Sequence, residues 1–176
     1  MAKIPDLNVK VNFEFDFSKL YQYLTPYFII AENHAKESPC QRRKYAALVA
    51  YGGPKADPLF VVENNSRESN CCNGFCARDT YSMLNGERVE IGAEVHAETA
   101  VLIKQPRKGW IFLMAGQTSN GTPLYGESVY PCHTCSLNIK FAGYTFVYLK
   151  KDKNNIIPVS IDTIIDYREK EWSSER

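Results

Sequence analysis

Two short motifs, separated by one apolar segment, constrain the fold of this chain more than any other feature. The first is HAE at residues 96–98, and the second is PCHTC at residues 131–135. Each motif opens a segment of helical composition and length, and proline or glycine follows each segment. The apolar run at residues 110–115 (WIFLMA) lies between them and is typical of a buried strand. The pattern therefore places both motifs at helix starts, with a strand between them.

Three side chains of these motifs, His96, Cys132 and Cys135, form a ligand set that suits zinc. Zinc prefers nitrogen and thiolate ligands in tetrahedral geometry, and a catalytic site keeps three protein ligands and one open position. Two cysteines three positions apart on the first turn of a helix lie on one face and can share a metal. The helix N-terminus also favours thiolate over thiol. The sequence therefore predicts one catalytic zinc held by these three residues.

Glu98 lies two positions after His96, so we expect it beside the metal and not bound to it. A carboxylate placed there can take a proton from the attacking water and deliver it to a substrate. The alternative is a closed structural zinc site, in which a fourth side chain such as His133 replaces water. Because His133 lies between the two cysteines, we expect it to point away from their shared face, which favours the catalytic site.

The order of the predicted elements indicates an α/β fold. We expect helices over 17–24 and 27–36, with Pro26 interrupting them or starting the second. The segments 45–51 and 59–63 should form a β-hairpin, and the strands near 110 and 144 should pair in parallel because a helix connects them. The remaining predicted elements are helices over 94–105 and 131–142, a strand over 156–160 and a short C-terminal helix with a charged tail. Together they predict a three-layer α/β/α domain with a central mixed sheet of about five strands.

The length and charge of the chain limit its domain count and its partners. With 176 residues, the chain matches the size of one domain, commonly ~100–200 residues. We expect a single domain over residues 1–176, with a core over about 17–160 and a charged C-terminal tail at 161–176. The net charge of +1 excludes a strongly basic binder that acts mainly by neutralising nucleic-acid phosphates, but it does not exclude a small anionic substrate.

The N-terminal region gives an expectation for the cellular compartment of the protein. Residues 1–12 carry charge and lack the apolar core of a signal peptide. The longest apolar stretch of the N-terminal region, residues 27–31, is far shorter than the ~20 residues of a membrane-spanning helix. We therefore expect a cytoplasmic protein with no membrane partner. In that reducing compartment, six cysteines favour metal or redox chemistry over disulfides.

On these motifs, the chain resembles the cytidine and deoxycytidylate deaminase superfamily, and within it the deoxycytidylate (dCMP) deaminases most of all. H-x-E followed by P-C-x-x-C is the signature of the zinc nucleobase deaminases. Residues 38–44 (SPCQRRK) resemble that family's S-x-C-x-R-R segment, and residues 76–90 resemble its stretch leading into the catalytic helix. Residues 130–148 are similar to its second zinc helix and the strand that follows. The similarity runs from about residue 28 to residue 150.

The resemblance implies a cytidine-deaminase-like fold and a zinc-dependent hydrolase that converts dCMP to dUMP and ammonia. It implies that His96, Cys132 and Cys135 bind the catalytic zinc and that Glu98 is the catalytic proton carrier. The implied partner is a small pyrimidine nucleotide and not a nucleic acid, and relatives are commonly homo-oligomers. Three other functions stay open: a cytidine or deoxycytidine deaminase, a deaminase of cytosine in single-stranded nucleic acid, and a non-enzymatic zinc-stabilised binding module.

The resemblance also implies contacts to the substrate. Relatives have an asparagine that contacts the sugar soon after the second strand, where Asn64 and Asn65 are the candidates here. Residues 62–64 (VEN) also resemble the V-E-N of free-cytidine deaminases, so the presence of a phosphate on the substrate stays open. Ala97, inside the first motif, is a further predicted contact. Because a guanidinium fork matches phosphate geometry, the candidates to meet a phosphate are Arg42, Arg43 and Arg78.

The chain departs from the family pattern in two places. Many relatives have a cysteine shortly before H-A-E, around Gly92 here, and some bind a second, structural zinc. This chain lacks that cysteine, so a second structural zinc is left open, with candidate ligands His34, Cys40, Cys71, Cys72 and Cys76. The segment 117–129 is longer than the usual connection, and its glycine, serine and asparagine content predicts a flexible loop over the mouth of the site.

Overall fold

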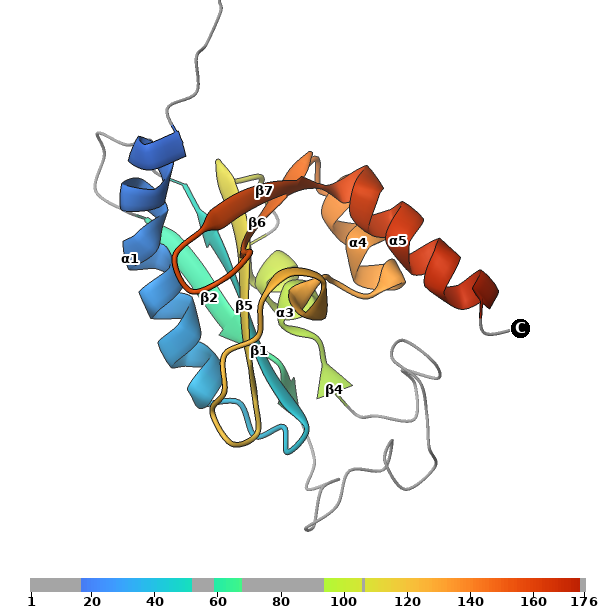
Figure 1. Ribbon diagram of the computed structural model, residues 1–176, viewed down its shortest axis with the longest axis horizontal. Coiled ribbons are helices and arrows are strands. Elements are labelled where there is room, and N and C mark those ends of the chain that lie inside the picture. The colour runs from blue at the N-terminus through green and yellow to red at the C-terminus, as the bar shows by residue number, and fades with distance from the viewer. Residues whose placement is uncertain (1–16, 52–58, 68–93, 106, 175–176) are drawn as a thin grey trace, which may run out of the picture.

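A five-stranded mixed sheet forms the centre of the molecule (Figure 1). The structure, a computed structural model, describes residues 17–51, 59–67, 94–105 and 107–174. The strands follow the spatial order β2-β1-β5-β6-β7. Their bounds are β1 (Arg43–Ala50), β2 (Phe60–Asn64), β5 (Ile111–Thr118), β6 (Phe146–Lys150) and β7 (Ile156–Ser160).

The pairing of these strands confirms the predicted fold class. β1 pairs antiparallel with β2, as the predicted hairpin requires, and antiparallel with β5 on its other side. β5 and β6 are parallel, with Leu113 opposite Tyr148, and β6 and β7 are antiparallel. A helix crosses between β5 and β6, because parallel neighbours cannot be joined by a tight turn. The domain is therefore a three-layer α/β/α structure on a mixed sheet of five strands.

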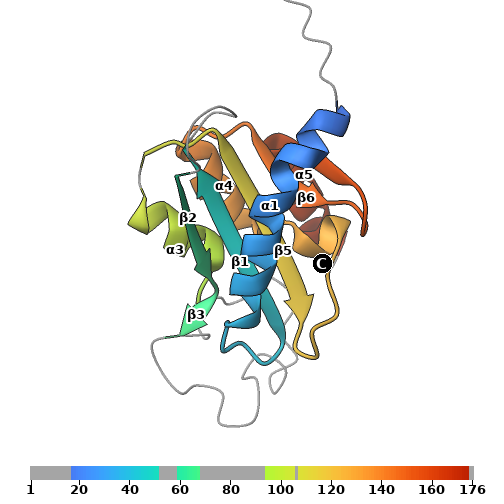
Figure 2. The same cartoon turned by 90° about the vertical axis from the view of Figure 1, so that its left-hand side faces the viewer.

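Helices cover both faces of the sheet. α1 (Phe17–Lys36) lies across one face, in front of β1 and β5 in Figure 2. The opposite face carries α3 (Ala97–Lys104), α4 (His133–Phe141) and α5 (Ile161–Ser174), which lie on the right of the sheet in Figure 1. No helix in the described part of the chain is both long and apolar enough to cross a membrane.

Alternate residues of β5 supply the two cores. Phe112 and Met114 point into the core under α3, α4 and α5, whereas Ile111, Leu113 and Ala115 point into the core under α1. Successive side chains of a strand lie on opposite faces, so a strand buried on both sides is apolar throughout. This accounts for the continuous apolar run that predicted a buried strand here.

Pro26 does not divide the first helix into the predicted segments 17–24 and 27–36. α1 is one helix of 20 residues with the proline inside it, and the Thr25 hydroxyl donates a hydrogen bond to the Tyr21 carbonyl at 2.6 Å. An interior proline costs about 3 kcal/mol, whereas each large apolar side chain that becomes buried stabilises by about 1.5–3 kcal/mol. The buried face continues on both sides of the proline: Leu20, Leu24, Tyr27, Phe28, Ala31 and Ala35.

The C-terminal segment forms the predicted short helix, and the apolar side of this helix belongs to the core. α5 starts at Ile161, directly after β7. Ile161, Ile164 and Ile165 are buried in the core under α3 and α4. Their spacing follows the helical period, which leaves the charged residues of the segment on the other side of the helix. The core therefore extends past the predicted boundary at residue 160.

The segment 117–129, predicted as a flexible loop, has regular structure. β5 extends to Thr118, whose N–H donates to the Thr122 carbonyl at 2.8 Å. The chain then returns beside β5, where the Leu124 N–H donates to the Gly116 carbonyl at 2.8 Å. A 3₁₀ helix, η2 (Gly126–Val129), completes the connection. Glycine, serine and asparagine here satisfy the geometry of tight turns.

Candidate metal centre

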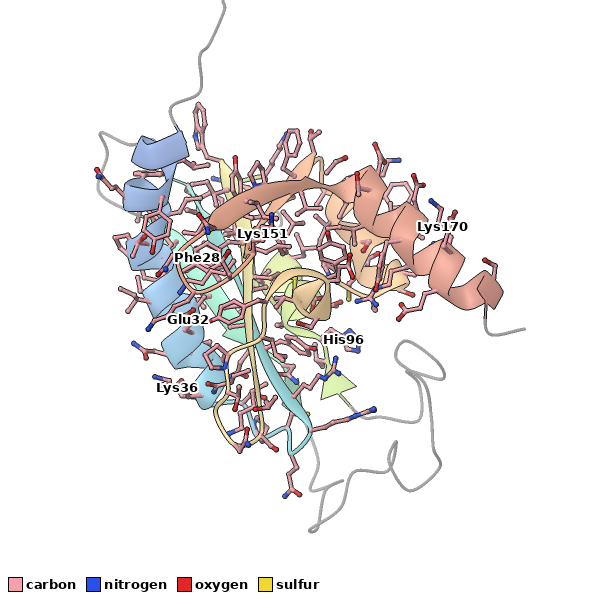
Figure 3. All side chains as sticks on the ribbon, viewed as in Figure 1. Phe28, Glu32, Lys36, His96, Lys151 and Lys170 are labelled. Atoms are coloured by element: carbon pink, nitrogen blue, oxygen red, sulfur yellow. The ribbon has the colours of Figure 1, made fainter. Side chains whose placement is uncertain are left out.

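The two sequence motifs begin neighbouring helices on the same side of the sheet. His96 is the N-cap of α3 and Cys132 is the N-cap of α4, and both have extended backbone conformations. The short strand β4 (Glu94–Val95) leads into His96 and pairs antiparallel with β3 (Ser66–Arg67). In Figure 3, His96 lies on the side of the sheet away from Phe28, Glu32 and Lys36 of α1. The N-terminal ends of both helices therefore face one site, where they favour anionic ligands.

The ligand atoms of His96, Cys132 and Cys135 lie within 4.8 Å of one another. His96 Nδ1 is 3.5 Å from Cys132 Sγ and 3.4 Å from Cys135 Sγ. Tetrahedral zinc with Zn–S of about 2.3 Å and Zn–N of about 2.1 Å sets nitrogen and sulfur about 3.6 Å apart. The three side chains therefore fit a zinc ion in both donor type and spacing.

The two thiols differ in their readiness to lose a proton. Hydrogen bonds to Cys132, first from Cys135 and then from His96, lower the pKa of the Cys132 thiol to about 4. The same Cys132–Cys135 hydrogen bond, together with burial, raises the pKa of the Cys135 thiol. The hydrogen bond between the two sulfurs therefore favours the thiolate on Cys132, and a bound metal would need both sulfurs as thiolates.

Glu98 lies beside this group and is not a member of it. Its side chain is only 5% exposed, in the first turn of α3. Burial raises the pKa of the Glu98 carboxyl, and the nearby positive charge of His96 acts in the opposite direction. A buried carboxyl with a raised pKa holds a proton closer to neutral pH than an exposed one, as a proton carrier requires.

His133 points away from the two cysteines that flank it. Its Nε2 lies 3.4 Å from Glu169 Oε1 on α5, and the ring is not part of the group of three ligands. The alternative of a closed site with His133 as fourth ligand therefore has no support in the geometry. A three-residue set leaves one position of a tetrahedral ion for water.

Three side chains that sequence inspection missed surround the ligand group. Thr99 Oγ1 lies 3.6 Å from Cys135 Sγ, so α3 contacts the sulfur that α4 supplies. The Tyr45 hydroxyl donates to the Ser128 carbonyl at 3.1 Å. Burial raises the pKa of this hydroxyl, and the charge of the nearby Glu98 carboxylate raises it further. Arg168 of α5 binds the carbonyls of Tyr130 and Pro131. Only Thr99 had a sequence signal, because it follows His96 by three positions on one helix face.

The predicted sugar contacts are not all brought to this site. Asn64 donates through Nδ2 to the His34 carbonyl of α1 at 3.3 Å, so it lies on the face of the sheet opposite His96. Asn65 is buried, and its Oδ1 accepts hydrogen bonds from the Ser38 hydroxyl and the Tyr45 N–H, both at 2.7 Å. These contacts make Asn65 a link between β1 and the chain before it. Ala97 is buried in the core beneath the start of α3.

The predicted phosphate and second-zinc residues fall in different places. Arg43 lies next to Tyr45, to whose hydroxyl its Nη1 donates at 3.5 Å. His34 forms a contact of 3.1 Å with Glu37, and Cys40 is buried. Within the described residues, neither His34 nor Cys40 belongs to a cluster of three metal-ligating side chains. Arg78, Cys71, Cys72, Cys76 and the motif segment 76–90 lie outside the residues that the structure describes.

Comparisons with known proteins add a structural likeness. No family model matches the chain, and no curated protein matches it. Among solved structures, the chain is similar to a point mutant of the cytidine deaminase from Mycobacterium tuberculosis. The match has 16% sequence identity and a TM-score of 0.39, and it covers 77% of this chain and 85% of that chain. These values assign neither a family nor a function to the chain.

Proposed function

We propose that this chain is a zinc-dependent hydrolase that deaminates the cytosine of a small pyrimidine nucleotide, converting dCMP to dUMP and ammonia. The observation that carries the proposal is the placement of His96 Nδ1 within 3.5 Å of both cysteine sulfurs, with Glu98 buried beside them. His96, Cys132 and Cys135 would hold the zinc, which when bound supplies Lewis-acid activation of water at its open position.

Glu98 is the proposed proton carrier. Hydrolytic deamination adds the elements of water across the C4–N bond and must deliver a proton to the departing amino group. Burial raises the pKa of Glu98, so its carboxyl oxygen can hold the proton lost by water and then return it to the substrate. Because the side chain is almost fully enclosed, this proton is not exchanged freely with solvent.

Arg43 supports a substrate that carries a phosphate. It lies two positions before Tyr45 on β1, on the same face of the sheet, and Tyr45 is near enough to Glu98 for their charges to interact. Among the residues that the structure describes, no carboxylate forms an ion pair with Arg43, so its guanidinium is available for an anionic ligand. The planar fork of arginine matches phosphate oxygens. We therefore propose Arg43 as the phosphate contact.

The other proposed functions have less support. Glu63 of the VEN segment forms an ion pair of 2.6 Å with Lys104, and Asn64 lies on the opposite face of the sheet, which disfavours the nucleoside deaminase. The net charge of +1 disfavours a deaminase acting along a nucleic-acid strand. Glu98 disfavours a binding module, because a structural zinc site does not need a buried carboxyl beside it.

The proposal includes a single domain over residues 1–176 that acts in the cytoplasm as a homo-oligomer. Large apolar side chains on the outside of the molecule support subunit contact, and the most exposed are Phe141, Trp110 and Ile103. Light scattering during gel filtration tests this part, and the mass of one chain at micromolar concentration would contradict it.

A substrate panel tests the reaction itself. Zinc-loaded protein is incubated with dCMP, deoxycytidine, cytidine, dCTP, cytosine and a cytosine-containing single-stranded oligonucleotide. Released ammonia and the change in ultraviolet absorbance are followed. We expect the highest kcat/KM with dCMP. Absence of turnover with every compound, in protein shown to contain zinc, would overturn the proposal.

Two matched variants test the phosphate contact. Arg43→Gln should lower kcat/KM for dCMP by about 10–100-fold, the loss of one charge-assisted hydrogen bond, while leaving deoxycytidine turnover unchanged. Lys44→Gln is the control, since this neighbouring cation donates to the Lys36 carbonyl on the α1 side of the sheet. Equal losses with both substrates, or equal losses in both variants, would remove Arg43 from phosphate recognition.

A further inference from the structure

Arg168 of α5 binds the backbone that leads into the cysteine motif. Its Nη2 donates to the Tyr130 carbonyl at 2.7 Å, and its Nε donates to the Pro131 carbonyl at 3.0 Å. Its Nη1 donates to Glu171 Oε2 at 2.7 Å, and the side chain is only 15% exposed. We propose that Arg168 is a positioning residue of the metal centre, which holds Cys132 and Cys135 where their sulfurs reach His96.

The carbonyls that Arg168 binds precede α4. Backbone groups before the first turn of a helix must find most of their hydrogen bonds elsewhere. The Pro131 carbonyl also accepts a long hydrogen bond of 3.5 Å from the Ser136 hydroxyl of α4. The next carbonyl, that of Cys132, accepts hydrogen bonds from the Ser136 N–H and the Ser136 hydroxyl, both at 2.9 Å. Three successive carbonyls are therefore bound, the first two by Arg168 and the last two by Ser136. A planar guanidinium fixes both of its acceptors in one orientation, which a flexible ammonium cannot do.

The ligands come from two helices, so their relative position must be set by contacts between elements. His96 belongs to the start of α3, and the cysteines belong to α4. α5 packs beside α4, and the Tyr130 and Tyr167 rings meet edge to face at 5.4 Å next to the arginine. The Arg168 guanidinium also lies 5.5 Å from the Tyr167 ring centroid. Arg168 therefore joins α5 to the segment immediately before Cys132.

The test measures metal binding, and it rests on the proposed zinc ligands but not on deaminase activity. Zinc affinity is determined by competition with a chromophoric chelator, and the visible spectrum of the Co²⁺-substituted protein reports the ligand geometry. Arg168→Gln should weaken zinc binding by about 10–100-fold and reduce the tetrahedral Co²⁺ absorption. Arg168→Lys, which keeps the charge and loses the fork, should weaken binding by about 3–10-fold.

Lys140→Gln is the matched control. Lys140 also links α4 to α5, through an exposed ion pair of 2.7 Å with Asp162, but it lies at the far end of α4 from Cys132. Its zinc affinity should stay within about twofold of the parent, since exposed ion pairs contribute little. A loss in this variant equal to that of Arg168→Gln would show a general effect of α4–α5 packing and overturn the proposal.

A purely structural role gives a different result. Arg168→Gln would then lower the melting temperature of the metal-free protein, yet the folded protein would bind zinc and Co²⁺ as the parent does. That result overturns the proposal. If Arg168→Gln does not fold, Arg168→Lys decides: parental zinc affinity and Co²⁺ spectrum would overturn the proposal, and weakened binding with a parental melting temperature would support it. Failure of the deaminase assay leaves these metal readouts intact.

Discussion

Both faces of the central sheet carry an apolar core, but the polar side chains that border the two cores differ. On the α1 face, Leu24, Phe28 and Leu113 pack together, and one half-buried ion pair, Lys150–Glu32, borders them at 2.5 Å. On the opposite face, Phe112, Val147 and Ile164 form a similar core. There, however, two helix starts bring a histidine, two cysteines and a buried carboxyl together.

Because of this difference, one face of the sheet contributes mainly to stability, and the other also carries the candidate reactive groups. A buried carboxyl is unfavourable unless charge or hydrogen bonds compensate it, whereas an apolar face is favourable without help. Substitutions on the α1 face should therefore change the stability of the protein and not its metal centre. The α3–α4–α5 face carries the groups that could hold a metal, and their placement fits the proposed zinc site and proton transfer. Four experiments act on one face or the other.

Removal of the metal should have the largest effect and should act on the α3–α4–α5 face. After dialysis against a chelator, we expect no deaminase activity, since water activation depends on the ion. Zn²⁺ should restore the activity and Mg²⁺ should not, because nitrogen and sulfur ligands suit zinc and not a hard cation. Full activity in protein shown by elemental analysis to contain no transition metal would contradict the proposed centre.

Glu98→Gln should follow in size. The amide keeps the shape of the side chain but cannot carry a proton, so kcat should fall by about 10²–10⁴-fold while the zinc content stays at one per chain. Glu32→Gln on the α1 face is the control, because it removes a carboxylate of the same type whose ion pair, within the described part of the chain, is with Lys150. Near-parental turnover of the Glu98 variant would exclude this residue from the reaction.

Phe28→Ala should affect the α1 face and leave the metal centre unchanged. The side chain is fully buried, so its truncation should lower the free energy of unfolding by about 3–5 kcal/mol. Its exposed neighbour provides the control: Ile29→Ala should change stability by less than about 0.5 kcal/mol. Urea denaturation measures both values. A weakened zinc affinity in the folded Phe28 variant would show that the two faces are coupled.

Thr99→Val should have the smallest effect. The variant removes the hydroxyl that contacts Cys135 Sγ and keeps the shape of the side chain, so zinc binding should weaken by about 2–10-fold. Thr163→Val, on the exposed side of α5, should leave zinc affinity unchanged. Chelator competition resolves differences of this size. Parental affinity in the Thr99 variant would show that the contact does not support the thiolate.

Local signals predicted most of the site. His96 and Cys132 were recognised because each precedes a helix, and Cys135 follows Cys132 at the spacing of one helical turn. The parallel pairing of β5 and β6 followed from the helix between them. These predictions depend on residues close together in sequence, where periodicity and helix-start signals are strongest.

Long-range contacts account for what was missed. Pro26 signals a helix break, but the buried face of α1 spans it and outweighs the lost hydrogen bond. Asn65 is a residue type that is common in ligand-binding loops, yet its side-chain oxygen accepts hydrogen bonds from Ser38 and from the Tyr45 N–H of β1. Arg168 lies in a charged segment that resembled a tail, and nothing nearby in the chain marks it as a partner of Tyr130.

By itself, the sequence determined the class of fold and predicted the group of three side chains that could hold a metal and the carboxyl beside them, because these depend on residue chemistry and short spacings. Only the tertiary structure decided that His133 turns toward α5, that Asn64 lies on the far face of the sheet, and that α5 supplies Arg168. The physical reason is that such contacts depend on how whole elements pack, and packing is set by the burial of many apolar side chains together.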